Sequence, residues 1–191
     1  KAQAGGGGRG MRIVKTIEDL PNLLARCQSE ALAAFGDDSV YVERLIPRAR
    51  HIEIQIIGDG EKICHLWERE CSVQRNHQKV IEIAPAPGLD PKLREQLINA
   101  ATTMAKRAQY RSLGTFEFLL DRVNPGNFYF IEANPRLQVE HTITESVTGI
   151  DLVQTQLRLA SGESLQSLGL TADNLPAPRG YAIQTRINME T

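Results

Sequence analysis

Two glutamates stand where a short hairpin would bring their carboxylates together. The seven residues 121–127 join two strand-like runs, and a symmetric antiparallel hairpin about them pairs residues whose numbers sum to about 248 or 249. This rule sets Glu117 opposite Glu132, with Asn134 two residues further along the same face. Like charges across a ladder are destabilising unless something neutralises them, and Mg²⁺ prefers oxygen ligands. We therefore predict a metal site here, with two solvated glutamates as the alternative.

A run of glycines near the start of the chain could bind phosphate. Such a run leaves backbone N–H groups unobstructed and allows positive φ angles, so that a loop can wrap phosphate oxygens. The pattern does not fit the dinucleotide motif, because this sequence lacks the acidic residue that the motif requires further along the chain. It does not fit the P-loop either, since Met11 and Arg12 stand where Lys and Ser/Thr are required. A phosphate-binding loop is our interpretation, with a flexible linker as the alternative. The glycines are Gly5, Gly6, Gly7, Gly8 and Gly10.

Residues 136–141 place a cation, an amide, a carboxylate and an imidazole in one short segment after the second strand of the hairpin. Loops at strand ends commonly carry catalytic groups. Arg136 could fork onto a planar anion such as bicarbonate, and Glu140 could act as a general base if its surroundings raise its pKa. An ordinary charged surface loop is the alternative.

A second polar segment, residues 68–79, is dense in charged and amide side chains. It is either a surface that faces a ligand or a solvated loop. Three cysteines, Cys27, Cys64 and Cys71, show no metal-binding spacing and no disulfide framework, so we expect them to be small buried apolar residues.

The hydrophobic periodicity predicts the elements that position these groups. Long antiparallel strand-like segments with helices between them indicate an α+β fold. Residues 163–179 are polar and contain proline, so we expect a loop there. Helices are expected over 18–35, 91–109 and 144–161, and strands over 40–46, 50–57, 62–73, 114–120, 128–133 and 180–188.

The overall composition excludes several classes of protein. The 191 residues carry 22 basic and 23 acidic side chains, which gives a net charge of −1, and 41% of them are hydrophobic. These values argue against disorder and against a protein that coats nucleic acid. We find no apolar run of roughly 18 residues that could span a membrane. The length suggests one domain or one plus part of another, and the absence of an initial methionine leads us to expect a piece of a longer protein.

The motifs together resemble the biotin carboxylase component of biotin-dependent carboxylases, which include the acetyl-CoA, propionyl-CoA and pyruvate carboxylases. The resemblance runs from Lys1 to at least Asn188, and its long motifs make it highly specific. They are KAQAGGGGRGM at 1–11, HIEIQ at 51–55, ECSVQRNHQK at 70–79, EIAPAP at 82–87, GTFEF at 114–118 and FIEANPRLQVEH at 130–141.

The resemblance implies the ATP-grasp fold, in which two α+β subdomains of antiparallel sheets and flanking helices hold ATP in a cleft. Residues 1–46 would be the glycine-rich lid subdomain up to the adenine hinge. Residues 47–191 would be the C-terminal subdomain, incomplete at its end, and the N-terminal domain of the parent enzyme would be absent.

The resemblance also implies roles for individual residues. Glu117 and Glu132 would hold Mg²⁺ or Mn²⁺ with Asn134 beside them, Glu140 would be the general base, and Arg186 would stabilise the biotin enolate. Bicarbonate would be bound by Lys79, Arg136, Gln138 and the backbone of Val139. ATP would be bound by Lys1, Gly5, Gly6, Gly7, Gly8, Gly10, Glu43, Arg44, Leu45, Ile46, His51, Gln74 and His77.

The implied reaction phosphorylates bicarbonate with Mg-ATP and then carboxylates biotin, making the parent enzyme a ligase. Biotin would arrive on a carrier domain, and a carboxyltransferase component would be a further partner. We expect the parent enzyme to be oligomeric, to bind neither nucleic acid nor membrane, and to lie in the cytoplasm, or in mitochondria if the source is eukaryotic.

Two alternatives stay open at this point. One is a carbamoyl-phosphate synthetase-type ATP-grasp ligase, which also phosphorylates bicarbonate, although segments 70–79 and 136–141 are closer to the biotin carboxylases. The other is a nucleotide-binding fragment without turnover, because we expect these 191 residues alone to be poorly active or inactive.

Overall fold

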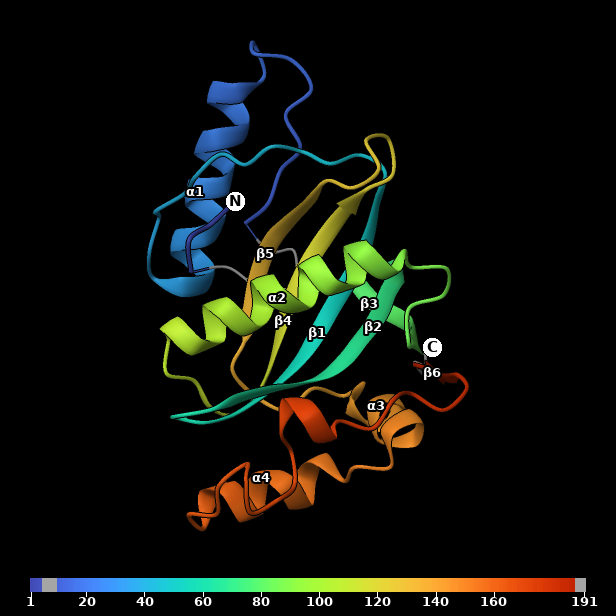
Figure 1. The fold of residues 1–191 in the computed structure, drawn as a ribbon. Coiled ribbons are helices and arrows are strands. Elements are labelled where there is room, and N and C mark those ends of the chain that lie inside the picture. Colours follow the sequence, from blue (N-terminus) through green and yellow to red (C-terminus); the bar gives the residue numbers. More distant parts are fainter. Residues whose placement is uncertain (5–9, 188–191) are drawn as a thin grey trace. The chain divides into compact units, whose positions relative to one another are not determined.

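The computed structural model describes residues 1–4 and 10–187, so Gly5, Gly6, Gly7 and Gly8 lie outside the described residues. The chain forms two compact units (Figure 1). The first contains Lys1–Pro47 together with Arg75–Gln78, and the second contains Arg48–Gln74 and the residues from Lys79 onward.

The first unit is built around helix α1, Leu20–Phe35, which confirms the helix predicted for 18–35. The helix ends at Gly36, whose φ of 74° is left-handed and whose N–H donates to the Leu32 carbonyl oxygen at 2.9 Å. The strand predicted over 40–46 is wrong. Within the described residues, Val40 forms one isolated bridge with Ala2, because the short segment at the chain start supplies the hydrogen bonds beside it and no longer strand pairs with it there.

The second unit contains a six-stranded sheet with the order β5-β4-β1-β2-β3-β6 (Figure 1). The pairs β1–β2, β1–β4, β4–β5 and β3–β6 are antiparallel. This architecture confirms the α+β prediction. The strands are β1 (Ala49–Asp59), β2 (Ile63–Arg75), β3 (Gln78–Ala84), β4 (Arg111–Asp121), β5 (Phe128–Asn134) and β6 (Ala182–Thr185).

The polar segment 68–79 forms the end of β2, a tight turn and the start of β3, a strand that the sequence analysis did not predict. Asn76 and His77 make the turn with φ angles of 52° and 61°. Two successive left-handed residues are the backbone of a type I′ hairpin turn, which keeps β2 and β3 antiparallel. The predicted final strand is shorter than expected, because β6 ends at Thr185.

The register places four charged side chains in one row across four strands. Glu53 on β1 lies between Arg69 on β2 and Glu117 on β4, and Glu117 in turn lies opposite Glu132 on β5. The predicted pairing of the two hairpin glutamates is therefore confirmed. A shift after Glu117 then pairs Phe118 with Phe130.

The face of the sheet that carries Ile52, Ile54 and Ile56 is apolar and is covered by α2, Pro91–Arg107 (Figure 1). Leu97, together with Ala101 and Ala105, packs into this core. The helix begins as predicted, since Asp90 Oδ1 accepts a hydrogen bond from the Leu93 N–H at 3.0 Å and proline follows the cap.

The opposite face carries the charged row and meets two short helices at one end. The single helix predicted over 144–161 is wrong, because the chain forms α3 (His141–Thr148) and α4 (Leu152–Ala160). Gly149 ends α3 with a φ of 76°, and the Asp151 side chain caps α4 through the Gln154 N–H at 2.7 Å. The loop predicted over 163–179 contains one short 3₁₀ helix, η1 (Ala172–Asn174). Across the described ranges, every helix is too short or too polar to cross a bilayer.

Candidate active site

The Lys79 ammonium group lies among three carboxylates on the charged face of the sheet. Its Nζ is 2.5 Å from Glu53 Oε2, 2.9 Å from Glu117 Oε1 and 2.7 Å from Glu140 Oε1. The three glutamates are at most 2% exposed, and they come from β1, β4 and the residue before α3. The fold therefore gathers distant residues around one partly buried cation.

These groups stay charged because they compensate one another. Burial alone would lower the pKa of Lys79, but the three surrounding carboxylates raise it. Burial would raise the pKa of Glu117, but hydrogen bonds from His51 and Lys79 lower it well below its usual range. The pKa of Glu140 is also lowered, since Lys79 outweighs burial. The base role of Glu140 was expected to depend on a raised pKa, and this condition is not met. Instead, neighbouring cations hold the carboxylate deprotonated.

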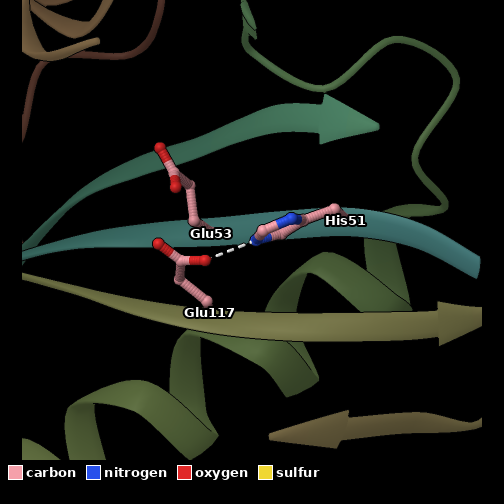
Figure 2. A group of neighbouring side chains, drawn as sticks. All are labelled: His51, Glu53 and Glu117. Atoms are coloured by element: carbon pink, nitrogen blue, oxygen red, sulfur yellow. Dashed lines mark hydrogen bonds and ion pairs between the residues drawn. The ribbon is translucent and has the colours of Figure 1, made fainter. Parts of the chain in front are cut away.

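His51 is fixed between two side chains (Figure 2). Gln74 donates to its Nδ1 at 2.7 Å, so the other ring nitrogen carries the proton and donates to Glu117 Oε2 at 2.6 Å. In Figure 2 His51 projects from β1 toward Glu117 on β4, and the Glu53 side chain extends from β1 on the same face of the sheet. Gln74 and His51, both predicted to bind ATP, are therefore in direct contact.

The predicted metal ligands meet at the β4–β5 edge of this cluster. Asn134 Nδ2 donates to Glu117 Oε1 at 2.9 Å and to Glu132 Oε1 at 3.3 Å, so the amide joins the two opposed carboxylates. Glu132 is exposed whereas Glu117 is buried. The two opposed carboxylates are ligands of the kind that a hard divalent cation prefers, whereas Asn134 turns its N–H₂ toward them and its Oδ1 toward Arg136.

The residues predicted to bind bicarbonate surround the same cluster. Gln138 is buried and its Nε2 donates to Glu117 Oε1 at 3.0 Å. Arg136 is exposed and donates to Asn134 Oδ1 at 3.3 Å, and Val139 is exposed beside Glu140. Lys79 and Gln138 are thus brought together on Glu117, with Arg136 further out.

Arg186 bridges two carboxylates at the β3–β6 edge. Its Nε donates to Glu82 Oε1 at 2.6 Å and its Nη2 to Glu140 Oε2 at 2.9 Å. Burial raises the pKa of Glu82, and Arg186 offsets only part of that shift. The predicted enolate-stabilising arginine therefore lies against the predicted base.

Three buried charged residues of this cluster were missed by the sequence analysis: Glu53, Arg69 and Glu82. Glu53 and Arg69 form a buried ion pair at 2.5 Å. The available signal was the alternation of Glu53 and Gln55 with isoleucines along β1, a pattern that is typical of a sheet with one buried face. A strand with both faces buried gives the same period, so alternation does not tell a solvated polar face from a functional one.

The first unit contains a cavity of about 350 Å³. Lys1 Nζ lies 3.6 Å from Glu43 Oε2, and both line the cavity. Ile46 is not among the lining residues, and Gly10 is buried against Ala2. The lining residues that were predicted to bind ATP are Lys1, Glu43, Arg44, Leu45 and His77.

Comparison with known proteins gives one consistent result. Residues 1–168 match the family described as "Carbamoyl-phosphate synthase L chain, ATP binding domain". The whole chain is 53% identical to pyruvate carboxylase of Schizosaccharomyces pombe and to mitochondrial pyruvate carboxylase of Homo sapiens, but it spans only 16% of the length of each.

Two solved structures superimpose closely. A biotin carboxylase–beta-gamma-ATP complex from Campylobacter jejuni matches with a TM-score of 0.91 and 45% identity over 97% of this chain and 40% of that one. A biotin carboxylase domain dimer of Hydrogenobacter thermophilus 2-oxoglutarate carboxylase, with MgADP, ADP and bicarbonate, matches with a TM-score of 0.90, 43% identity and the same coverage. These matches confirm the resemblance and the ATP-grasp fold predicted from the motifs.

Proposed function

Because the chain belongs to the family of carbamoyl-phosphate synthase L-chain ATP-binding domains, we propose that it is the central ATP-binding part of a biotin carboxylase. The enzyme that contains it would phosphorylate bicarbonate with Mg-ATP and carboxylate biotin on a carrier domain. A carbamoyl-phosphate synthetase is not favoured, since relatives over the full chain at 53% identity are pyruvate carboxylases.

The observation that carries the proposal is the Lys79 cluster. Phosphoryl transfer is catalysed mainly by positioning and by cations that neutralise the transferred group. Here a partly buried ammonium group, the Gln138 amide and the Arg186 guanidinium lie within hydrogen-bond range of carboxylates that could receive a metal or a proton. Anion-binding and acid–base groups thus share one site.

We assign the metal to the β4–β5 edge of the sheet. Glu117 and Glu132 would hold Mg²⁺ or Mn²⁺, with Asn134 beside them, and their oxygen donors suit such an ion. When bound, the ion would neutralise charge on the ATP phosphates. Lys79 now pairs with Glu117, and we expect it to exchange this contact for the anionic substrate.

Bicarbonate would lie between Lys79, Arg136, Gln138 and the Val139 backbone. Glu140 would accept the bicarbonate proton while a bicarbonate oxygen attacks the γ-phosphate, giving carboxyphosphate and ADP. The lowered pKa of Glu140 keeps this carboxylate unprotonated near neutral pH. Its contact with Lys79 must loosen for it to become a stronger base.

ATP and biotin are assigned to the remaining groups. Lys1 and the glycine run would contact the ATP phosphates, and the cavity beside Glu43 and Leu45 would take the adenine. Arg186 would stabilise the biotin enolate, because its planar charged donors match an oxyanion. A biotin carrier domain and a carboxyltransferase component would be the partners of the complete enzyme, which we expect to be oligomeric.

A Glu140→Gln substitution in the full-length protein tests this assignment. We expect bicarbonate-dependent ATP cleavage to fall about 100-fold or more, because the proton acceptor is lost. The Kd for Mg-ATP, measured by calorimetry, should change less than about twofold. The matched control is Glu163→Gln, which removes the ion pair of this half-buried glutamate with the exposed Arg158 and should behave as wild type. Equal losses in ATP binding and turnover would refute the role of a base, and wild-type ATP cleavage without bicarbonate dependence would refute the proposed function.

A further inference from the structure

The Arg69 side chain is fully buried at the centre of the charged face of the sheet. Its guanidinium donates to acceptors on several elements of the second unit. The acceptors are Glu53 Oε1 at 2.5 Å, Gln55 Oε1 at 2.8 Å, Thr144 Oγ1 at 2.8 Å, Thr115 Oγ1 at 3.3 Å and Gln138 Oε1 at 3.4 Å.

Two of these acceptors belong to the candidate active site, and Arg69 determines which way each one points. Glu53 gives Oε1 to Arg69, which leaves Oε2 for the Lys79 ammonium group at 2.5 Å. Gln138 turns its carbonyl oxygen to Arg69, so that its amide N–H₂ donates to Glu117 at 3.0 Å. Loss of the guanidinium would remove the hydrogen bonds that hold Glu53 and Gln138 in these orientations.

The chemistry of the site favours arginine in this position. A planar guanidinium has five N–H donors in a fixed fork, whereas an ammonium group has three donors around one point. Only the fork can hold a carboxylate on β1, a threonine on α3 and the Gln138 amide together. A buried charge is also a weak source of stability compared with apolar packing, so this network is better explained by orientation than by stability.

We propose that Arg69 is a positioning residue of the anion site: it fixes the Glu53 carboxylate and the Gln138 amide, and through them the place of Lys79. This inference rests on the proposed function for its kinetic consequence, but the orientation of the two side chains can be tested independently. Arg69 is not among the residues assigned above to ATP or bicarbonate.

The test is Arg69→Lys in the full-length protein, which keeps the positive charge beside Glu53 but loses the fork. We expect the KM for bicarbonate to rise about tenfold, while the KM for Mg-ATP stays within about twofold, because only the anion site is disturbed. In a Gln138→Ala background the same change should raise the bicarbonate KM less than about twofold further, since residues that act through one group are not additive. Arg158→Met, which removes an exposed ion pair, is the control and should leave both constants unchanged.

Two results would overturn the inference. One is kinetic and applies if the wild-type enzyme depends on bicarbonate. It is either an unchanged bicarbonate KM in Arg69→Lys or fully multiplicative effects of the Arg69 and Gln138 substitutions on that KM. The other is a crystal structure of the Arg69→Lys protein in which Glu53 and the Gln138 amide keep their orientations. This second measurement decides the inference even if the wild type shows no bicarbonate-dependent turnover, a result that would refute the proposed function alone.

Discussion

The two faces of β1 are equally buried and are held by opposite kinds of interaction. Ile52, Ile54 and Ile56 are 0% exposed and pack against α2, whereas Glu53 between them is also 0% exposed and pairs with Arg69 and Lys79. The apolar face needs no partner of defined geometry. The charged face is stable only while each member has its partners, because a buried unpaired charge is strongly destabilising.

The difference teaches where function resides in this sheet. Apolar side chains on one face supply the free energy of folding, and charged side chains on the other hold groups that can exchange their partners for a substrate. Substitutions at neighbouring positions of one strand should therefore have different consequences, and the predictions below test this division.

The largest effect on stability is expected for Glu53→Leu on the charged face. The change leaves the buried Arg69 guanidinium without its carboxylate and should lower the free energy of unfolding by about 4 kcal/mol, measured by urea denaturation. The double variant Glu53→Leu with Arg69→Met should regain at least about half of this loss, because no buried charge is then left unpaired. Bicarbonate-dependent turnover should stay low in both variants. A double variant no more stable than the single one would show that the pair is not the source of the loss.

On the apolar face, Ile54→Ala should lower the free energy of unfolding by about 3 kcal/mol, because it creates a cavity in the core beneath α2. Turnover per folded molecule should remain within about twofold of wild type, since the side chain points away from the charged cluster. The control is Leu157→Ala on α4, which removes an exposed side chain and should change stability by less than about 0.5 kcal/mol. Loss of turnover without loss of stability in Ile54→Ala would contradict the division between the faces.

The smallest effect concerns His65 on β2, outside the charged cluster. Burial lowers its pKa to about 4, and its Nδ1 accepts the Trp67 N–H at 3.2 Å. The unfolded chain therefore binds a proton that the folded one does not. The contribution of neutral His65 to the free energy of unfolding is fully present above pH 6.5 and declines as the pH falls toward 4. At pH 5 the loss should be about 2 kcal/mol relative to pH 7.5, measured by urea denaturation at each pH.

A His65→Gln variant should lose most of this pH dependence. Glu117 and Glu140 do not mask the effect, because their lowered pKa values place their own loss of stability below pH 4.5. If wild type and variant declined equally between pH 7.5 and 5, another group would be responsible.

The sequence predicted those features that depend on neighbours along the chain. The hairpin length predicted the pairing of Glu117 with Glu132, and the helix predicted from residue 91 begins at Pro91. The break at Gly149 was missed because one glycine inside an apolar period is compatible with a continuous helix.

Features that depend on several strands could not be predicted in this way. Glu53 and Arg69 are neighbours only through the β1–β2 register, and Glu140 meets Lys79 only after the chain has folded. The direction of the Glu140 pKa shift could not be predicted for the same reason, since a cation 61 residues away in the chain lowers this pKa. Long-range contacts of this kind carry no local periodicity.

The grouping of Arg75–Gln78 with Lys1–Pro47 has a consequence for recombination between homologous genes. The boundary between the two units crosses the polypeptide three times, after Pro47, after Gln74 and after Gln78. A single recombination event at Pro47 would join the first unit of one ancestor to the β2–β3 turn of another. Exchange of an intact unit requires three junctions, so we expect the two units to be exchanged together rather than singly during evolution.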